Sequence, residues 1–137
     1  MSRVFLVRHG QTAWNVGEIF RGRADIPLDE TGKHEVHLAG ETLKDETLHA
    51  VYSSPLSRSM ETAENIAKFH DISVMPLDAI IDISYGEWEG LGNQEVQQKY
   101  PELHALWLSE PHKVLFPGGE SLDEVRSRTM AALEDLL

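Results

Sequence analysis

Short apolar runs alternate in the first half of the chain with segments in which apolar residues recur every three or four positions. The short runs predict strands at residues 4–7, 50–52 and 73–77, and the periodic segments predict helices at residues 31–44 and 56–69. Strands that alternate with helices in this order are typical of a parallel sheet with right-handed helical crossovers. We therefore expect an α/β fold in which the first run lies in the interior of the sheet.

The second half of the chain predicts helices joined by loops. Residues 80–92 combine aromatic side chains with glycines and are interpreted as a surface loop. We expect one helix at residues 94–100 and another that begins at Pro101, because proline is favoured in the first helical turn. Ser121 and Glu124 have the spacing of a capping box, which predicts a last helix. The apolar stripe of that helix consists of Val125, Thr129, Ala132, Leu133 and Leu136.

Composition narrows the classes of function. The chain has 137 residues, which suits a single domain, and it has no cysteine, which excludes disulfides and thiolate chemistry. Twelve Lys and Arg against 23 Asp and Glu give a net charge of −11, which argues against a nucleic-acid or anionic membrane surface. No segment has the pattern of a signal peptide or a membrane span, so we expect a cytoplasmic protein. An acidic protein that binds a phosphate ester needs a local cluster of positive groups.

Seven histidines raise the question of a metal site, but none has a recognised ligand spacing. His34 and His37 lie one helical turn apart, and exposed side chains on a helix are the preferred interpretation over a metal pair. We expect no metal in the site.

Basic side chains follow the ends of the predicted strands. Arg8 and His9 come directly after the first strand, and Arg58 follows the second. Because ligands of parallel α/β sheets bind at the carboxyl ends of the strands, we expect these side chains to meet there. Guanidinium groups suit phosphate oxygens, and neighbouring positive charge disfavours the imidazolium form, which leaves a neutral ring nitrogen as a nucleophile.

The motifs of this chain closely resemble those of the histidine phosphatase superfamily. They are R-H-G-Q-T-x-W-N at residues 8–15, S-P-L-x-R at residues 54–58 and P-G-G-E-S at residues 117–121. R-H-G alone would be a weak signal, but the three motifs occur in the family's order and spacing over essentially the whole chain. The resemblance implies a three-layer α/β/α fold with a mostly parallel sheet, as in the phosphoglycerate mutases.

The resemblance also implies a two-step phosphoryl transfer without a cofactor. His9 would attack phosphorus and become a phosphohistidine, while Arg8 and Arg58 hold the phosphate oxygens and Asn15 adds a further donor. The other substrate-binding candidates are Gln11, Thr12, Arg21 and Gly22. The partner would be a small phosphorylated metabolite, with a homodimer left open as the assembly state.

Relatives supply the proton for the leaving group from a carboxylic acid before a G-x-W-E-G type segment, a position that is Asp82 in this chain. Many relatives have glutamate there, so the shorter aspartate is a departure. Glu87 and Glu89 are rival acids, and we interpret them as structural or exposed loop residues.

Several of these residues could instead have purely structural roles. Arg8 and His9 could simply end a strand, and Arg58 could pair with Glu61 one helical turn later. The serines of S-S-P lack the G-x-S-x-G pattern of a nucleophile and suit a turn. Trp14, Trp88 and Trp107 are more often packing anchors than substrate contacts.

The family's second histidine, in a segment like V-S-H-G on a later strand, has no counterpart in the sequence. We therefore interpret residues 1–137 as the N-terminal portion of a single histidine phosphatase domain, truncated after the helix that starts near Ser121. The favoured function is hydrolysis of phosphomonoesters, because G-E-W-E-G resembles the phosphatase branch. A phosphoglycerate mutase, which would need priming by 2,3-bisphosphoglycerate, is the alternative enzyme. The alternative of another class is a noncatalytic phosphate-binding module or an inactive fragment.

Overall fold

The computed structural model describes residues 2–137 of the chain and divides into two compact units. The first unit comprises residues 2–13 and Asp25–Ile81, together with Leu137. The second comprises Trp14–Ala24 and Asp82–Leu136.

The described residues 2–137 form eleven labelled elements. They are the α-helices and strands α1 (Ala13–Val16), α2 (Glu30–Leu43), β1 (Val51–Ser53), α3 (Ser57–Ala67), β2 (Val74–Pro76), α4 (Asn93–Lys99), α5 (Pro101–Ser109) and α6 (Leu122–Leu136), and the 3-10 helices η1 (Asp78–Ile80), η2 (Gly86–Trp88) and η3 (Pro111–Lys113). Among residues 2–137, no helix combines the length and the apolar character needed to cross a lipid bilayer.

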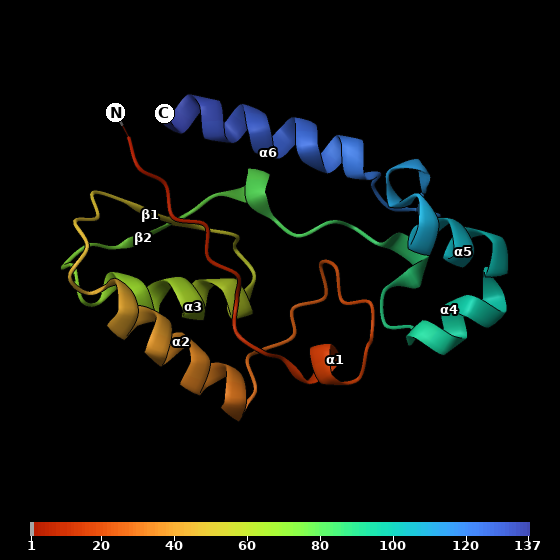
Figure 1. The fold of residues 1–137 in the computed structure, drawn as a ribbon, viewed down its shortest axis with the longest axis horizontal. Coiled ribbons are helices and arrows are strands. Elements are labelled where there is room, and N and C mark those ends of the chain that lie inside the picture. The colour runs from red at the N-terminus through yellow and green to blue at the C-terminus, as the bar shows by residue number, and fades with distance from the viewer. Residues whose placement is uncertain (1) are drawn as a thin grey trace. The chain divides into compact units, whose positions relative to one another are not determined.

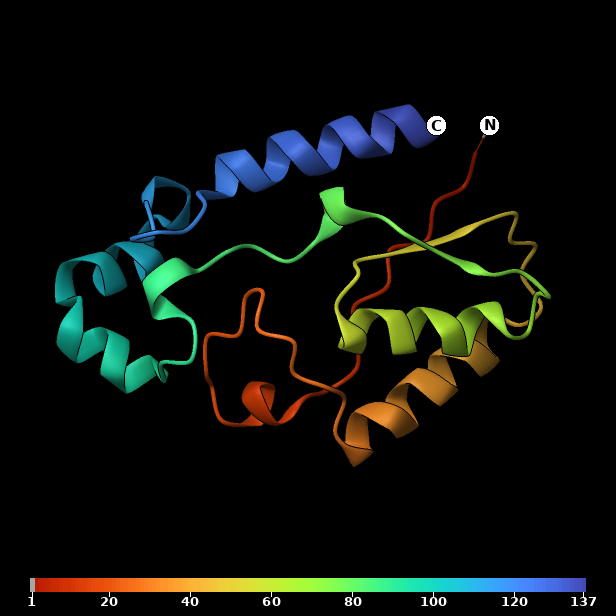
Figure 2. The same ribbon diagram turned by 180° about the vertical axis from the view of Figure 1, so that it is seen from behind.

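The first unit is built on a two-stranded parallel sheet. β1 and β2 pair with Val51 opposite Val74 and Ser53 opposite Pro76. α3 connects the two strands and packs against both, and α2 packs against α3. Both helices lie on the same side of the strands (Figures 1 and 2). The predicted parallel α/β arrangement of this region is confirmed.

The contact between α2 and α3 depends on residues that the helical periodicity places on the inner faces. Val36 of α2 and Ile66 of α3 are buried. A Cβ atom on Gly40 would collide with the carbonyl oxygen of Asn65, so glycine allows the two helices to approach closely. Asp29 caps α2, because its Oδ1 accepts from the Gly32 amide at 2.7 Å.

Residues 4–7 do not form the buried strand that their apolar pattern predicts. They belong to no strand of the described chain, and Phe5, the least exposed of them, is 37% exposed while Leu6 is 90% exposed. The prediction was wrong because an apolar, β-branched run shows only a local preference for an extended backbone. A buried strand also needs neighbouring strands and a covering layer, and the sheet within residues 2–137 contains only β1 and β2.

The second unit is held together by an aromatic core. Its buried cluster consists of Ile83, Trp88, Val96, Val114 and Phe116. The ring centroid of Trp88 lies 5.1 Å from that of Phe20 and 4.9 Å from that of Phe116, both in edge-to-face geometry. Part of the predicted surface loop at residues 80–92 is therefore buried, and Trp88 is the packing anchor that we expected.

The helices of the second unit agree with the prediction. α4 and α5 occupy the expected positions, with Pro101 in the first turn of α5. The capping box at the start of α6 is formed, because the Glu124 amide donates to Ser121 Oγ at 3.2 Å and the Ser121 amide donates to Glu124 Oε2 at 3.1 Å.

Candidate active site

His9 lies at the start of the polar loop that follows residues 4–7. Its Nδ1 is 2.7 Å from the carbonyl oxygen of Gly10. Because a carbonyl oxygen can only accept, Nδ1 carries the hydrogen of this bond. In the neutral ring the lone pair is then on Nε2, the atom that a nucleophilic role requires.

The backbone at His9 is fixed by its neighbour Gly10. The Gly10 amide donates to Thr62 Oγ1 at 3.2 Å, and Thr62 Oγ1 donates to the carbonyl oxygen of Arg58 at 2.7 Å. A Cβ atom on Gly10 would lie 2.7 Å from the carbonyl oxygen of Gly32 and 2.9 Å from a methyl group of Val36, so the site requires glycine. α2 and α3 thus together set the position of His9.

Arg58 is the second residue of α3 and is completely buried. Its charge is felt by Asp25, whose pKa is held below the ordinary value by hydrogen bonds from Ser57 and, to a smaller extent, by the Arg58 guanidinium. Arg8 precedes His9 and is exposed. The structure therefore places three of the predicted catalytic residues, His9, Arg8 and Arg58, in the first unit.

The serines before α3 make turn contacts. Ser53 Oγ donates to the carbonyl oxygen of Ser54 at 2.7 Å, and Ser54 Oγ accepts from the Leu56 amide at 3.4 Å. Both side chains are buried. These contacts agree with the interpretation of S-S-P as a turn rather than a serine nucleophile.

Gln11 and Thr12 connect the loop to the start of α2. Gln11 Nε2 donates to Asp29 Oδ2 at 2.9 Å, and the Gln11 amide donates to Glu35 Oε1 at 2.9 Å. The bond from Gln11 is the main cause that lowers the pKa of Asp29. Thr12 is completely buried and forms a bridge with Leu28. Both side chains thus have structural contacts in the first unit.

Asp82 belongs to the second unit and is partly exposed. Its Oδ1 accepts from the Ile83 amide at 2.8 Å, and its Oδ2 lies 3.9 Å from Arg21 Nε. The structure brings together two predicted site residues here, a carboxyl group and a guanidinium. Proton donation and recognition of an anionic group are the chemistry that such a pair can perform.

Arg21 also lines a surface pocket of about 330 Å³. The other lining residues are Glu18, Ile19, Phe20, Tyr85 and Asn93. Gly22 follows with φ +51°, and a Cβ atom there would lie 2.9 Å from the carbonyl oxygen of Ile83, so the turn favours glycine. Asn15 lies in α1, close in sequence to the pocket, and is half-buried.

The two rival acids make other contacts. Glu89 Oε1 accepts from the Arg23 amide at 3.0 Å and from the Tyr85 amide at 3.2 Å. Glu87 accepts from the Tyr100 hydroxyl at 2.8 Å, and this bond raises the pKa of Tyr100. Both glutamates are therefore engaged in holding local structure.

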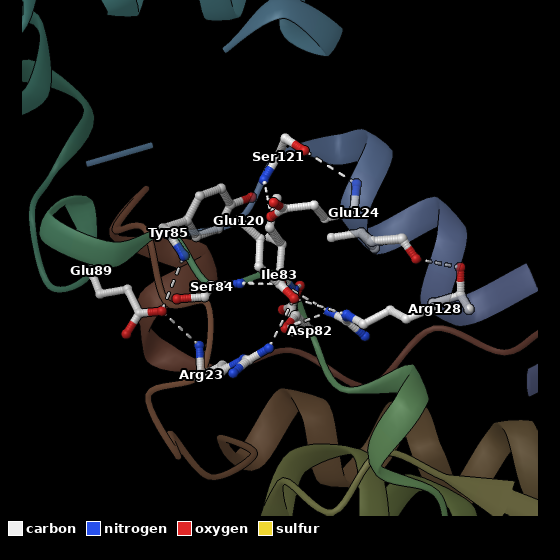
Figure 3. Close-up of polar contacts among 12 residues, drawn as sticks. Arg23, Asp82, Ile83, Ser84, Tyr85, Glu89, Glu120, Ser121, Glu124 and Arg128 are labelled. Atoms are coloured by element: carbon white, nitrogen blue, oxygen red, sulfur yellow. Dashed lines mark hydrogen bonds and ion pairs between the residues drawn. The ribbon is translucent and has the colours of Figure 1, made fainter. Parts of the chain in front are cut away.

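A cluster of charged residues around Glu120 was not predicted from the sequence. Glu120 pairs with Arg128 of α6 and with Arg23, and it accepts from the Ser84 amide (Figure 3). The Arg128 hydrogen bonds hold the pKa of Glu120 below its ordinary value. Glu120 lies within the P-G-G-E-S motif, and that motif was the only signal that could have identified it.

No group of three or more His, Asp or Glu side chains that could hold a metal ion occurs in residues 2–137. His34 and His37 are both exposed on α2.

The family of the chain follows from a comparison of sequences. The profile of the histidine phosphatase superfamily (branch 1) matches residues 4–137. The chain therefore belongs to the histidine phosphatase superfamily, as its three motifs predict.

Relatives extend this result. The chain is 42% identical over 136 residues to phosphoserine phosphatase 1 of Hydrogenobacter thermophilus, covering 99% of this chain and 64% of the relative. It is 32% identical over 135 residues to the probable phosphoglycerate mutase GpmB of Photorhabdus laumondii, covering 98% of this chain and 63% of the relative. Among solved structures it resembles Bacillus stearothermophilus YhfR, with a TM-score of 0.89 and 31% identity over 94% of this chain and 64% of that one. The predicted phosphoglycerate mutase-like α/β fold is confirmed, and the chain spans a little under two thirds of the length of these proteins.

Proposed function

We propose that the chain is the nucleophile-bearing portion of a phosphatase that hydrolyses small-molecule phosphomonoesters through a phosphohistidine on His9. The observation that carries this proposal is the bond from His9 Nδ1 to the Gly10 carbonyl oxygen at 2.7 Å, which leaves the lone pair on Nε2. The buried Arg58 supports it, because a guanidinium held out of water binds phosphate oxygens strongly.

The reaction has two balanced steps. His9 Nε2 forms a bond to phosphorus while the bond to the ester oxygen breaks, and the leaving alkoxide takes the proton of Asp82. A water molecule then attacks phosphorus, the nitrogen–phosphorus bond breaks, and the proton of the water returns to the Asp82 carboxylate. Arg8, Arg58 and Asn15 would hold the phosphate oxygens during both steps. The role of Asp82 rests on its motif position.

The names of the relatives favour a carboxylated substrate. One relative is named as a phosphoserine phosphatase and another as a probable phosphoglycerate mutase. The pocket that Arg21 lines offers a guanidinium to such a carboxylate. We propose a small phosphomonoester of a hydroxy acid or amino acid as the substrate class.

Labelling tests the nucleophile. The chain incubated with ³²P-labelled substrate should acquire a phospholabel that is labile in acid and stable in base, and His9→Ala should abolish it. His34→Ala is the matched control, because His34 is exposed on α2, and it should keep the label. Equal labelling of the wild type and the His9→Ala variant would refute the proposal.

A phosphoglycerate mutase is the second candidate, supported by the relative with that name. A coupled assay separates the two enzymes. A mutase should interconvert phosphoglycerates after priming with 2,3-bisphosphoglycerate, whereas a phosphatase should release inorganic phosphate without priming.

A noncatalytic phosphate-binding module or an inactive fragment is the candidate of another class. It should bind inorganic phosphate without forming a covalent label. Calorimetric binding together with absent labelling would favour it over both enzymes.

Three further properties belong to the same proposal. Residues 1–137 would form the N-terminal portion of one histidine phosphatase domain, act in the cytoplasm, and be free to assemble as a homodimer. Cell fractionation tests the compartment, and light scattering coupled to size-exclusion chromatography tests the assembly state.

A further inference from the structure

We propose that Glu120 and Arg128 are positioning residues that fix the backbone of residues 82–84 and thereby place the Asp82 carboxyl group for proton transfer. This inference rests on the proposed function, because it assumes that Asp82 is the proton donor. It adds two residues to which the resemblance assigns no role.

Glu120 holds Ser84 from two sides. The Glu120 amide donates to the Ser84 carbonyl oxygen at 2.8 Å, and Glu120 Oε2 accepts from the Ser84 amide at 3.0 Å. Gly119 is pressed against the same carbonyl oxygen, where a Cβ atom would collide with it. The backbone two residues after Asp82 is therefore fixed to the P-G-G-E-S turn.

Arg128 holds both Glu120 and the backbone of Asp82. Its Nε donates to Glu120 Oε1 at 3.0 Å and its Nη2 donates to Glu120 Oε2 at 3.0 Å, which is a bidentate pair. The same Nη2 lies 3.3 Å from the carbonyl oxygen of Asp82 and donates to it. In Figure 3 the Arg128 side chain reaches from α6 toward Asp82 and Ser84, so one guanidinium connects the helix to the segment that carries the proposed acid.

The ion pair of Glu120 and Arg128 is partly protected from water, and a second cation, Arg23, also contacts Glu120. The side chains of Glu120 and Arg128 are 18% and 21% exposed, respectively, and Arg23 Nη2 adds a contact to Glu120 Oε1 at 3.1 Å. Hydrogen bonds from Arg128 lower the pKa of Glu120, so this carboxylate stays ionised and remains an acceptor in weak acid.

The Asp82 side chain depends on this backbone. Aspartate has only two side-chain torsions, so its carboxyl group cannot move far from its own Cα atom. Oδ1 is also tied to the neighbouring Ile83 amide at 2.8 Å. A shift of residues 82–84 would therefore move the carboxyl group itself, and displacement of a catalytic group by about 1 Å can cost about 100-fold in rate.

Two substrates with different leaving groups test the inference on the full chain. O-phosphoserine leaves as an alkoxide that needs a proton, whereas p-nitrophenyl phosphate leaves as a stable phenolate that does not. We expect Glu120→Gln and Arg128→Lys to lower kcat/KM for O-phosphoserine about 10- to 100-fold and to change kcat/KM for p-nitrophenyl phosphate less than about threefold. Asp82→Asn should show the same selectivity with a larger loss.

Matched controls come from the same helix. Arg126→Lys and Glu134→Gln alter exposed charges of α6 and should leave both kcat/KM values unchanged. Equal losses on the two substrates in Glu120→Gln and Arg128→Lys, or equal losses in the control variants, would overturn the inference.

Amide hydrogen exchange separates this inference from the proposed function. Glu120→Gln and Arg128→Lys should accelerate exchange at Ser84 at least tenfold without changing exchange in α3. If the wild type neither hydrolyses the substrates nor acquires a label on His9, the proposed function has failed. Accelerated Ser84 exchange would still support the part played by Glu120 and Arg128 in fixing residues 82–84, and unchanged exchange would overturn it. Should Glu120→Gln not fold, Arg128→Lys supplies the same measurements.

Discussion

The two units of the chain hold their proposed catalytic groups by different means. In the first unit, the neighbourhood of His9 is set by backbone and hydroxyl contacts, with the Gly10 amide on Thr62 and no room for a side chain at Gly10. In the second unit, the segment of Asp82 is held by charged side chains, above all by the pair of Glu120 and Arg128. Close packing does not respond to pH or salt, whereas ion pairs respond to both. We therefore expect the nucleophile to keep its position under conditions that loosen the acid.

We expect the largest loss of stability from a substitution in the core of the second unit. Trp88 is completely buried among Phe20 and Phe116, so Trp88→Ala should cost about 3–5 kcal/mol of unfolding free energy. Hydrogen exchange should accelerate throughout Asp82–Leu136 and much less in α2 and α3. Leu108→Ala is the control, because Leu108 is 71% exposed. Uniform acceleration in both units would contradict the separation.

We expect a smaller loss of stability from a substitution at Gly10 in the first unit. Gly10→Ala places a methyl group against the Gly32 carbonyl oxygen and Val36, and we expect a loss of about 1–3 kcal/mol in urea unfolding. Labelling of His9 should fall with it. Gly92→Ala is the control, because its nearest contact, Glu95 Oε1 at 3.6 Å, is an ordinary one. Equal effects of the two variants would show that close packing at Gly10 does not matter.

The hold on the Asp82 segment should also depend on pH. Because the pKa of Glu120 is lowered in the folded chain, its contribution is present above the ordinary carboxyl value near 4.5 and is lost as pH falls through the lower folded value. We expect the wild type to lose more unfolding free energy than Glu120→Gln as the pH falls below about 4.5. Urea unfolding followed by tryptophan fluorescence measures the difference. Parallel pH curves for the two proteins would rule out an ionic hold on the segment.

The smallest effect concerns the cap of α6. Ser121→Ala removes the acceptor for the Glu124 amide and should cost about 1 kcal/mol, whereas Ser121→Asp keeps an acceptor and should restore most of it. Thermal unfolding measures both variants. A cost in Ser121→Asp as large as in Ser121→Ala would mean that the cap contributes little.

Sequence patterns predicted the elements whose signals are local. The capping box at Ser121 and the proline at the start of α5 identified helices, because each supplies hydrogen bonds or backbone geometry to its own first turn. The prediction of a buried strand at residues 4–7 was wrong, because the burial of a strand is decided by segments distant in sequence.

The candidate site likewise contains residues that the sequence predicted and contacts that it did not. His9 and Arg58 were found by motif, and the structure adds the direction of the His9 ring through the Gly10 carbonyl oxygen. The link from Glu120 and Arg128 to Asp82 joins residues about 40 positions apart, and no periodicity reports such a contact. The sequence showed Glu120 only as a member of the P-G-G-E-S motif and did not indicate its contacts.

The exposed run at residues 4–7 has a consequence for handling the protein. Four consecutive β-prone apolar residues that lie in water, with Leu6 90% exposed, resemble the segments through which chains stick to one another. The net charge of −11 keeps copies apart, so we expect turbidity to rise in high salt, where that repulsion is screened. Leu6→Lys should delay the onset of aggregation in a light-scattering assay. An unchanged onset would show that the chains aggregate through another surface.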